Sequence, residues 1–333
     1  MHDIHFLYLN GPDIEALELT DDEILDAVEA GLRAQGDGAT VIEPRVHLEP
    51  DPAFRGHFNV LRGYVAPMNL AGVKVVGDYI DNYTKGLPSE MALLNLFDPR
   101  TGMPTALLDA TAITEMRTGA VTALGAKYLA RADSRSLGHI GARGTAYWNV
   151  RLLDHLFDFA EIRVHSRRAE SREPFAERLA SDLGKPVVAT EDWESCLTGA
   201  DIKVEASRLA APEPLFKTAW VRPGDLLVPY GTQSTLEADL PDVVDKFVMD
   251  DLGQLGAGKL GALRPHINAG TVTPDSFHAE LCEVVTGRKT GRETPEETIL
   301  FWHRGLSLSD IALGHAMIEK AKQRGVGQSL RYA

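Results

Sequence analysis

Residues 136 to 149, SLGHIGARGTAYWN, consist of an apolar run, a glycine-rich turn and the start of a helical pattern. This order is typical of the Rossmann dinucleotide-binding turn, where three small residues surround a pyrophosphate. Those three positions hold Gly141, Arg143 and Ala146, so Arg143 departs from the pattern. We expect Gly144 to take over the close backbone approach, while the Arg143 side chain either reaches a phosphate or points to solvent. On the turn alone, an ordinary strand-to-helix connection explains the pattern equally well.

The following strand, EIRVHS, ends at Ser166, Arg167 and Arg168. Folds that bind NAD commonly carry an acidic residue here for the ribose hydroxyls, and this chain has none. A hydroxyl followed by two guanidinium groups suits a 2′-phosphate, because arginine offers bidentate charged donors. The sequence therefore predicts NADP(H) as the preferred cofactor, with NAD(H) possible. The alternative is a solvated basic turn at the start of a helix.

From residue 136 onward, strand-like and helical patterns alternate, which predicts a parallel sheet with helices on both faces. The expected strands are 136–140, 161–166, 186–190, 201–206, 225–231 and 246–251, and the expected helices are 144–158 and 169–183. The fold class is therefore α/β, with a Rossmann-type doubly wound domain.

The first part of the chain has a different pattern. Thr20 and Glu23 form a capping box, which predicts the start of a helix that ends at Gly36 and Gly38. Strand-like runs at 57–65, 71–77 and 91–98 follow without intervening helices, so we expect an antiparallel sheet. A long helix rich in alanine and glycine is expected over 111–131.

The last helical pattern is expected to begin with Ser309 as its cap and to end with basic residues before Gly325. We expect this helix to return to the first domain. The predicted organisation is an α+β domain of residues 1–115 with 305–333, and a Rossmann domain of residues 116–304.

Composition excludes several classes of partner. The formal charge of −14 argues against nucleic acid and anionic membranes, which both require a basic face. No apolar run approaches the ~18 residues of a membrane span, and the first residues lack a basic leader. The two cysteines, Cys196 and Cys282, have no metal-ligand spacing. We therefore expect a cytoplasmic protein without a metal site.

Residues 85–131, KGLPSEMALLNLFDPRTGMPTALLDATAITEMRTGAVTALGAKYLAR, resemble the ornithine cyclodeaminase and mu-crystallin family, and so do AGVKVVG, the glycine turn and GLSLSDIALG. This family includes ornithine and lysine cyclodeaminases, ketimine reductases and archaeal alanine dehydrogenases. The resemblance implies a first domain that holds the substrate and forms a homodimer through its sheet, a Rossmann domain for a nicotinamide cofactor, and a cleft between the two.

The resemblance also implies roles for individual residues. Lys74 matches the catalytic lysine, Arg45 and Arg117 match arginines that hold a substrate carboxylate, and Thr118 matches a residue at the cofactor phosphates. From the sequence alone, Lys74 is instead interpreted as a surface lysine on a half-exposed strand. Arg117 lies among small and apolar residues, so its guanidinium needs an anion, which is a substrate carboxylate, Glu115 or another protein acid.

The expected site residues form two sets. Those expected to contact substrate are Arg45, Lys74 and Arg117. Those expected to contact the cofactor are Arg117, Thr118, Gly141, Arg143, Gly144, Thr145, Ser166, Arg167, Arg168, Ser207 and Gly231.

The chain departs from the cyclodeaminase pattern at two points. The segment VPYGTQSTLEADL has Thr232 and Gln233 where cyclodeaminases carry an Asp, and the strand HFNVLRGYV lacks their Glu. That strand instead carries His57 and Asn59, which either recognise a polar substrate end or are solvated. His303 and Arg304 are further candidates near the cofactor.

Because reduction needs no base to remove a substrate amine, the missing acids favour a reductase. The sequence therefore predicts an NAD(P)H-dependent reductase of a small imino acid or cyclic ketimine carboxylate, of amino-acid dehydrogenase type. Two alternatives remain: a cyclodeaminase-type lyase that releases ammonia, and a cofactor-binding protein with little catalysis.

Overall fold

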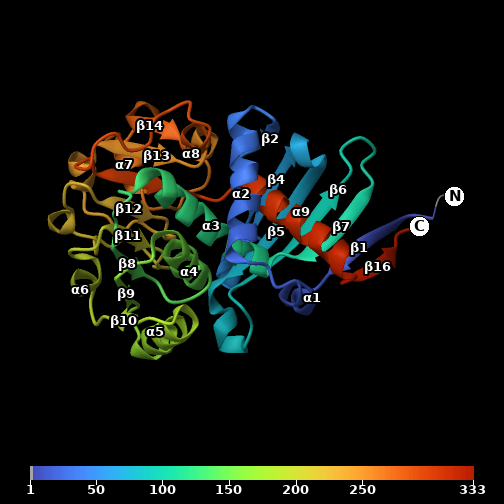
Figure 1. The fold of residues 1–333 in the computed structure, drawn as a ribbon, viewed down its shortest axis with the longest axis horizontal. Helices are drawn as coiled ribbons and strands as arrows, with labels where there is room; N and C mark the ends of the chain where they lie inside the picture. Colours follow the sequence, from blue (N-terminus) through green and yellow to red (C-terminus); the bar gives the residue numbers. More distant parts are fainter. Residues whose placement is uncertain (1–2) are drawn as a thin grey trace. The chain divides into compact units, whose positions relative to one another are not determined.

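The computed structural model describes residues 3–333 and divides into two compact units (Figure 1). The first unit runs to Arg117 and includes Gly256–Gly258 and Leu306–Ala333. The second unit comprises Thr118–Leu255 and Lys259–Gly305. Helix α3, Thr111–Leu129, carries the chain from one unit into the other, and it confirms the long helix expected over 111–131.

The first unit is built on one mixed sheet in the order β16-β1-β7-β6-β5-β4-β2, with β3 paired to β4. Its elements are β1 His5–Leu9, α1 Gly11–Ala16, α2 Asp21–Gly36, β2 Thr40–Ile42, β3 Val46–Leu48, β4 Gly56–Val65, β5 Leu70–Tyr79, β6 Glu90–Phe97, β7 Pro104–Asp109, α9 Ser307–Arg324 and β16 Gln328–Arg331. Strands β4, β5 and β6 pair antiparallel, as predicted.

Helices α2 and α9 pack against each other, and α9 lies over β4, β5 and β6 (Figure 1). The predicted capping box begins α2: the Glu23 N–H donates to the Thr20 hydroxyl at 3.2 Å, and the Thr20 N–H donates to the Glu23 carboxylate at 2.7 Å. The return of the last helix to the first unit is confirmed, and Gly325 ends α9 in the left-handed conformation at φ 68°.

The predicted cap of that last helix is wrong. Helix α9 begins at Ser307 with Leu306 as its N-cap, so Ser309 lies inside the first turn and is fully buried. The physical reason is Gly305, whose positive φ of 82° turns the chain before Leu306. The Ser307 hydroxyl then donates to the Arg62 carbonyl at 2.8 Å, which joins the helix start to β4.

The second unit is a parallel sheet in the order β10-β9-β8-β11-β12-β15-β13-β14. Its elements are β8 Ser136–Ile140, α4 Ala146–Phe157, β9 Glu161–His165, α5 Ala169–Leu183, β10 Val188–Ala189, α6 Trp193–Leu197, β11 Ile202–Glu205, β12 Leu226–Pro229, β13 Lys246–Met249, α7 Arg264–Ala269, β14 Phe277–Glu280, α8 Leu281–Val285 and β15 Ile299–Trp302. This doubly wound sheet confirms the predicted fold class.

The strand order reverses beside β8. The chain first adds β9 and β10 on one side of β8, then returns to place β11 and β12 on the other. In doubly wound sheets, ligands bind at the carboxyl ends of the strands where the order reverses. The glycine turn after β8 lies at that position. Among residues 3–333, no helix is long and apolar enough to cross a membrane.

Candidate active site

Strand β5 turns Lys74 toward the face of the sheet that α9 covers. Lys74 pairs directly with Leu61 of β4 and Leu94 of β6, and both of these leucines are buried. Lys74 itself is only 1% exposed. The interpretation of Lys74 as a surface lysine is therefore wrong, because the strand's alternation places it under α9 with the core residues.

Lys74 and Arg117 meet at one carboxylate oxygen. The Lys74 Nζ lies 2.5 Å from Asp310 Oδ1, and the Arg117 Nε donates to the same oxygen at 3.0 Å. Lys74 also donates to the Thr114 hydroxyl at 3.1 Å, and Thr114 in turn donates to the Ala110 carbonyl at 2.7 Å. The strand, helix α3 and helix α9 thus each contribute one charged side chain to a buried trio.

The charges of this trio do not cancel. Two cations, Lys74 and Arg117, share the single anion Asp310, which leaves one net positive charge in a buried place. Burial and the neighbouring Arg117 charge together lower the pKa of Lys74 to about 8, although Asp310 and Glu90 act in the opposite direction. Such a site favours a bound anion and holds a proton that is exchanged near neutral pH.

Asp310 is a member of this trio that the sequence analysis did not single out. The need of Arg117 for an anion was recognised, and Asp310 is the protein acid that meets it in the structure. A sequence clue was present in GLSLSDIALG, where Asp310 is the one charged residue in a helical run that is buried throughout. A lone carboxylate in such a run requires a buried cation as partner.

Arg45 lies in the connection between β2 and β3 and is half-buried. Arg62 holds this connection by donating to the Pro44 carbonyl at 3.1 Å and to the Glu43 carboxylate at 3.1 Å. The role of Arg45 in binding a carboxylate stays a prediction.

His57 and Asn59 lie on the same face of the sheet as Lys74. The Asn59 amide nitrogen is 3.2 Å from the His57 Nε2, and the His47 and His57 rings lie 5.4 Å apart. These polar groups continue the Lys74 face toward the start of β4, and their role in recognising a polar substrate end stays a prediction.

In the second unit, the turn after β8 has the geometry that a diphosphate requires. Gly141 has a φ of 116°, and a Cβ there would lie 3.0 Å from the Ala206 carbonyl oxygen. Gly144 has a φ of 56° and open space where a side chain would be. Thr145 is the N-cap of α4, yet its side chain makes no capping hydrogen bond. The turn therefore fits the diphosphate of a dinucleotide at the start of a helix.

The arginines predicted to bind a phosphate of the cofactor are exposed to solvent. Arg143 donates to the Ser171 hydroxyl of α5 at 3.1 Å, which brings its guanidinium to the segment after β9. Arg167 lies 3.4 Å from Glu213, and Arg168 lies 3.8 Å from Glu170. Each of these two arginines already has an acidic neighbour.

A buried carboxyl supports the other predicted cofactor residues. The Ser207 N–H donates to Glu205 Oε1 at 2.7 Å, and a Cβ on Gly231 would lie 2.6 Å from Glu205 Oε2. Burial raises the pKa of Glu205 to about 7. Glu205 was not among the residues singled out from sequence. Thr118 is 6% exposed, at the start of the second unit.

The candidates after β15 are also part of the second unit. His303 is buried, and its Nε2 lies 3.0 Å from the Thr122 hydroxyl of α3. The Arg304 N–H donates to Asp250 Oδ2 at 2.8 Å, and its guanidinium lies over the Trp302 ring.

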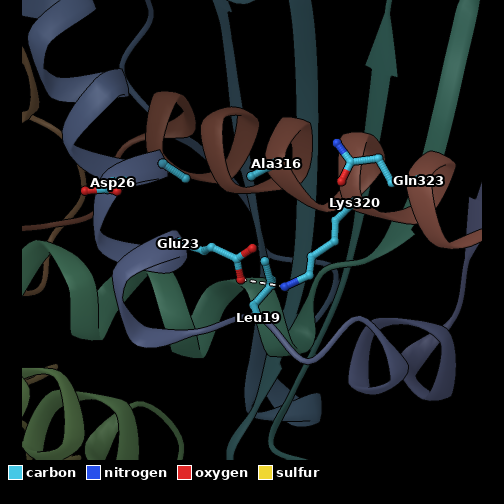
Figure 2. A pocket seen from close by; sticks show the side chains of 7 residues that line it. Leu19, Glu23, Asp26, Ala316, Lys320 and Gln323 are labelled. Atoms are coloured by element: carbon cyan, nitrogen blue, oxygen red, sulfur yellow. Dashed lines mark hydrogen bonds and ion pairs between the residues drawn. The ribbon is translucent and has the colours of Figure 1, made fainter.

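A surface hollow between α2 and α9 is separate from these groups. Figure 2 shows Lys320 reaching Glu23 across it, at 2.5 Å. No predicted site residue lines this hollow. The ion pair ties the two helices together.

The fold and these groups define a two-unit α/β protein with a Rossmann dinucleotide turn and a buried lysine–aspartate–arginine trio. The chain belongs to the ornithine cyclodeaminase/mu-crystallin family, whose model matches residues 8–325. The resemblance stated from the sequence is thereby confirmed.

Three relatives show what this chain is similar to. The alanine dehydrogenase of Archaeoglobus fulgidus is 31% identical over 330 residues, which span 98% of both chains. The structure of Thermococcus litoralis Δ1-pyrroline-2-carboxylate reductase with NADH and L-proline has a TM-score of 0.90 and 30% identity, covering 98% of this chain and 100% of that one. An archaeal alanine dehydrogenase dimer with bound NAD has a TM-score of 0.90 and 30% identity, covering 99% and 100%. Two of these relatives are alanine dehydrogenases and one is a pyrroline-2-carboxylate reductase, and the two solved structures contain NAD or NADH.

Proposed function

We propose that this protein is an NAD(P)H-dependent reductase of a small imino acid or cyclic ketimine carboxylate, acting as an amino-acid dehydrogenase in reverse. The observation that carries the proposal is the buried trio of Lys74, Asp310 and Arg117, with its net positive charge and a lysine pKa of about 8. In this trio, Arg117 would bind the substrate carboxylate and Lys74 would carry the proton.

The residues take distinct roles in this proposal. Arg117 holds the substrate carboxylate with the part of its guanidinium that does not face Asp310, and Arg45 provides a second cation. Lys74 holds a proton on Nζ and delivers it to the imine nitrogen, while Asp310 keeps the ammonium oriented. A bound reduced nicotinamide supplies the hydride that the imine carbon receives. The C=N bond thus becomes a C–N bond with one new C–H and one new N–H.

A reductase is preferred to a cyclodeaminase because of the groups that the chain lacks. Neither the strand 57–65 nor the segment Thr232–Gln233 has the carboxylate that amine removal would use. The second candidate function is nevertheless a cyclodeaminase-type lyase, since the intact Lys74 and Arg117 serve either chemistry. The third alternative, a cofactor-binding protein with little catalysis, is disfavoured because Lys74, Arg45 and Arg117 are all intact.

The cofactor would be held by the turn after β8 and by the loops after β11 and β12. Gly141, Gly144 and Thr145 would face the diphosphate, and Ser207 and Gly231 would border it. We propose NADPH as the preferred form, with NADH possible. Support comes from Arg143, which reaches Ser171 and so adds a third guanidinium beside Ser166, Arg167 and Arg168.

We further propose a homodimer through the open face of the first sheet. This face is opposite α9 and carries apolar residues, among them Leu93 at 48% and Met91 at 44% exposure. Large exposed apolar faces of this kind commonly mark interfaces. The buried free thiols of Cys196 and Cys282 are in keeping with the reducing cytoplasm proposed as its compartment.

The experiment follows cofactor turnover and ammonia together. Purified protein is mixed with NADPH or NADH and a panel of imino acids, including cyclic ketimine carboxylates, and with ornithine in parallel. A reductase oxidises one cofactor per imine reduced. Ammonia released from ornithine without net cofactor consumption would establish the lyase instead. If the protein shows neither cofactor oxidation nor ammonia release across the panel, both candidate functions are refuted.

A further inference from the structure

Tyr230, the residue directly after β12, joins three elements of the second unit. Its hydroxyl lies 2.7 Å from the Thr145 hydroxyl at the start of α4. The Asn149 amide nitrogen, one turn further along α4, also donates to the Tyr230 oxygen. The Tyr230 ring lies 4.5 Å from the His303 ring, centroid to centroid. None of the roles assigned above explains this arrangement.

The orientation of the Asn149 amide is set by His139, which is fully buried in β8. Its Nδ1 lies 3.1 Å from the Gly141 carbonyl oxygen, and a carbonyl only accepts, so Nδ1 carries the hydrogen. Burial lowers the pKa of His139 to about 4, so the ring is neutral at working pH. Its Nε2 is therefore an acceptor.

The acceptor on His139 fixes the amide of Asn149. The amide nitrogen lies 3.4 Å from His139 Nε2, and placing the amide oxygen there would set two acceptors against each other. The same nitrogen has a second hydrogen, which goes to the Tyr230 oxygen. The Tyr230 and Thr145 hydroxyl oxygens lie 2.7 Å apart, and either hydroxyl can donate to the other; we take Tyr230 as the donor.

With Tyr230 as the donor of this bond, the Thr145 proton is left for another acceptor. An N-cap threonine usually accepts a hydrogen bond from its own helix, and this one does not. Its oxygen is engaged by Tyr230, and the preceding residue, Gly144, has open space where a side chain would be. A hydroxyl held in this way is a directed donor for an anion at the helix start.

We propose that Tyr230 is a positioning residue that holds the Thr145 hydroxyl as a donor to the diphosphate of a bound dinucleotide. This inference rests on the proposed function, because it needs a dinucleotide at the turn after β8. It extends that function by assigning the phosphate donor and the hydrogen-bonded chain, from Gly141 through His139, Asn149 and Tyr230, that aims it.

The test compares Tyr230→Phe, Thr145→Val and the double variant in titrations with NADPH, NADH, ADP-ribose and 2′-phospho-ADP-ribose. Tyr230→Phe keeps the ring beside His303 and removes only the hydroxyl. Tyr147→Phe is the matched control, because Tyr147 is on the same helix and its hydroxyl bonds Asp182 at the surface. Binding is measured by calorimetry, and the melting temperature of each variant is recorded.

The expected result is a loss of about 3- to 10-fold in affinity for Tyr230→Phe, the effect of one aligned hydrogen bond. The loss should be equal for dinucleotides and ADP-riboses, because both contain the diphosphate. The double variant should bind no more weakly than Thr145→Val alone, since Tyr230 acts through Thr145. Tyr147→Phe should bind as wild type does.

Three outcomes overturn the inference while wild-type binding stands: unchanged affinity in Tyr230→Phe, additive losses in the double variant, or a loss confined to ligands with the nicotinamide ring. The last would place Tyr230 at the nicotinamide instead. If Tyr230→Phe fails to fold, the affinities of Thr145→Ser and Thr145→Val for the dinucleotides are compared instead. Serine keeps the hydroxyl donor and valine does not, so equal losses of affinity in the two variants refute the inference. Wild-type protein that binds no dinucleotide would refute the proposed function itself.

Discussion

Replacing Asp310 with Asn removes the one anion that Lys74 and Arg117 share. The amide keeps the shape of the side chain but not its charge, so two buried cations face each other without compensation. Removing one partner of a buried ion pair typically costs about 3–5 kcal/mol. At roughly 2–4 °C per kcal/mol for a unit of this size, the melting temperature should fall by about 6–20 °C.

The same substitution should also change the pH dependence of turnover. Asp310 raises the pKa of Lys74, which burial and Arg117 hold at about 8. In the proposed mechanism, protonated Lys74 is the active form, so kcat/KM should fall as the pH rises through about 8 in the wild type. Without Asp310 the lysine loses its proton at lower pH, and the decline should move below 8.

The assays are thermal unfolding at pH 7 and pH profiles of kcat/KM with the best imino acid from the panel. Asp225→Asn is the matched control, because Asp225 pairs with the buried Lys203 in the second unit, and burial lowers the pKa of Lys203 to about 8 as well. This control should destabilise the protein and leave the pH profile in place. Unchanged stability in Asp310→Asn, or a decline that stays at about pH 8, would refute the reasoning.

Three further substitutions test the remaining roles. Lys74→Met should preserve cofactor binding and lower turnover by about 10²-fold or more, the range of a positioned acid, and near-normal kcat would remove Lys74 from the mechanism. Arg117→Lys keeps the charge but not the planar guanidinium, so KM for the imino acid should rise at least several-fold while the protein stays folded; insoluble protein would indicate a purely structural ion pair. Arg167→Ala should weaken NADPH binding by up to about tenfold and leave NADH binding unchanged, a modest effect because this side chain is exposed and already near Glu213. Tighter binding of NADH than of NADPH to the wild type would contradict the proposed preference.

Local patterns in the sequence were sufficient for most of the elements. The capping box at Thr20, the alternation of β8 to β12 with their helices, and the antiparallel run of β4 to β6 are all short-range features, and each was predicted. Strands β1, β2, β3, β7, β14, β15 and β16 were not predicted. Several of them pair with partners distant in the chain, such as β15 with β12, and β1 and β16 bring together the two ends of the described chain. A strand that is stabilised mainly by pairing with distant strands has little local sequence pattern from which it can be predicted.

The family could be recognised from the sequence because its motifs are contiguous, and the importance of Lys74 and Arg117 followed from that resemblance. The environment of these two side chains could not be predicted from the sequence. On period alone Lys74 looked like a surface lysine, because burial depends on which face of β5 the distant helix α9 covers. The partner Asp310 stands 236 positions from Lys74 along the chain, and only tertiary folding brings the two together at one oxygen. The identity of the charged residues was thus determined by the sequence, while their shared carboxylate, and the proton affinity that burial and charge impose on the lysine, were decided by the packing of strand against helix.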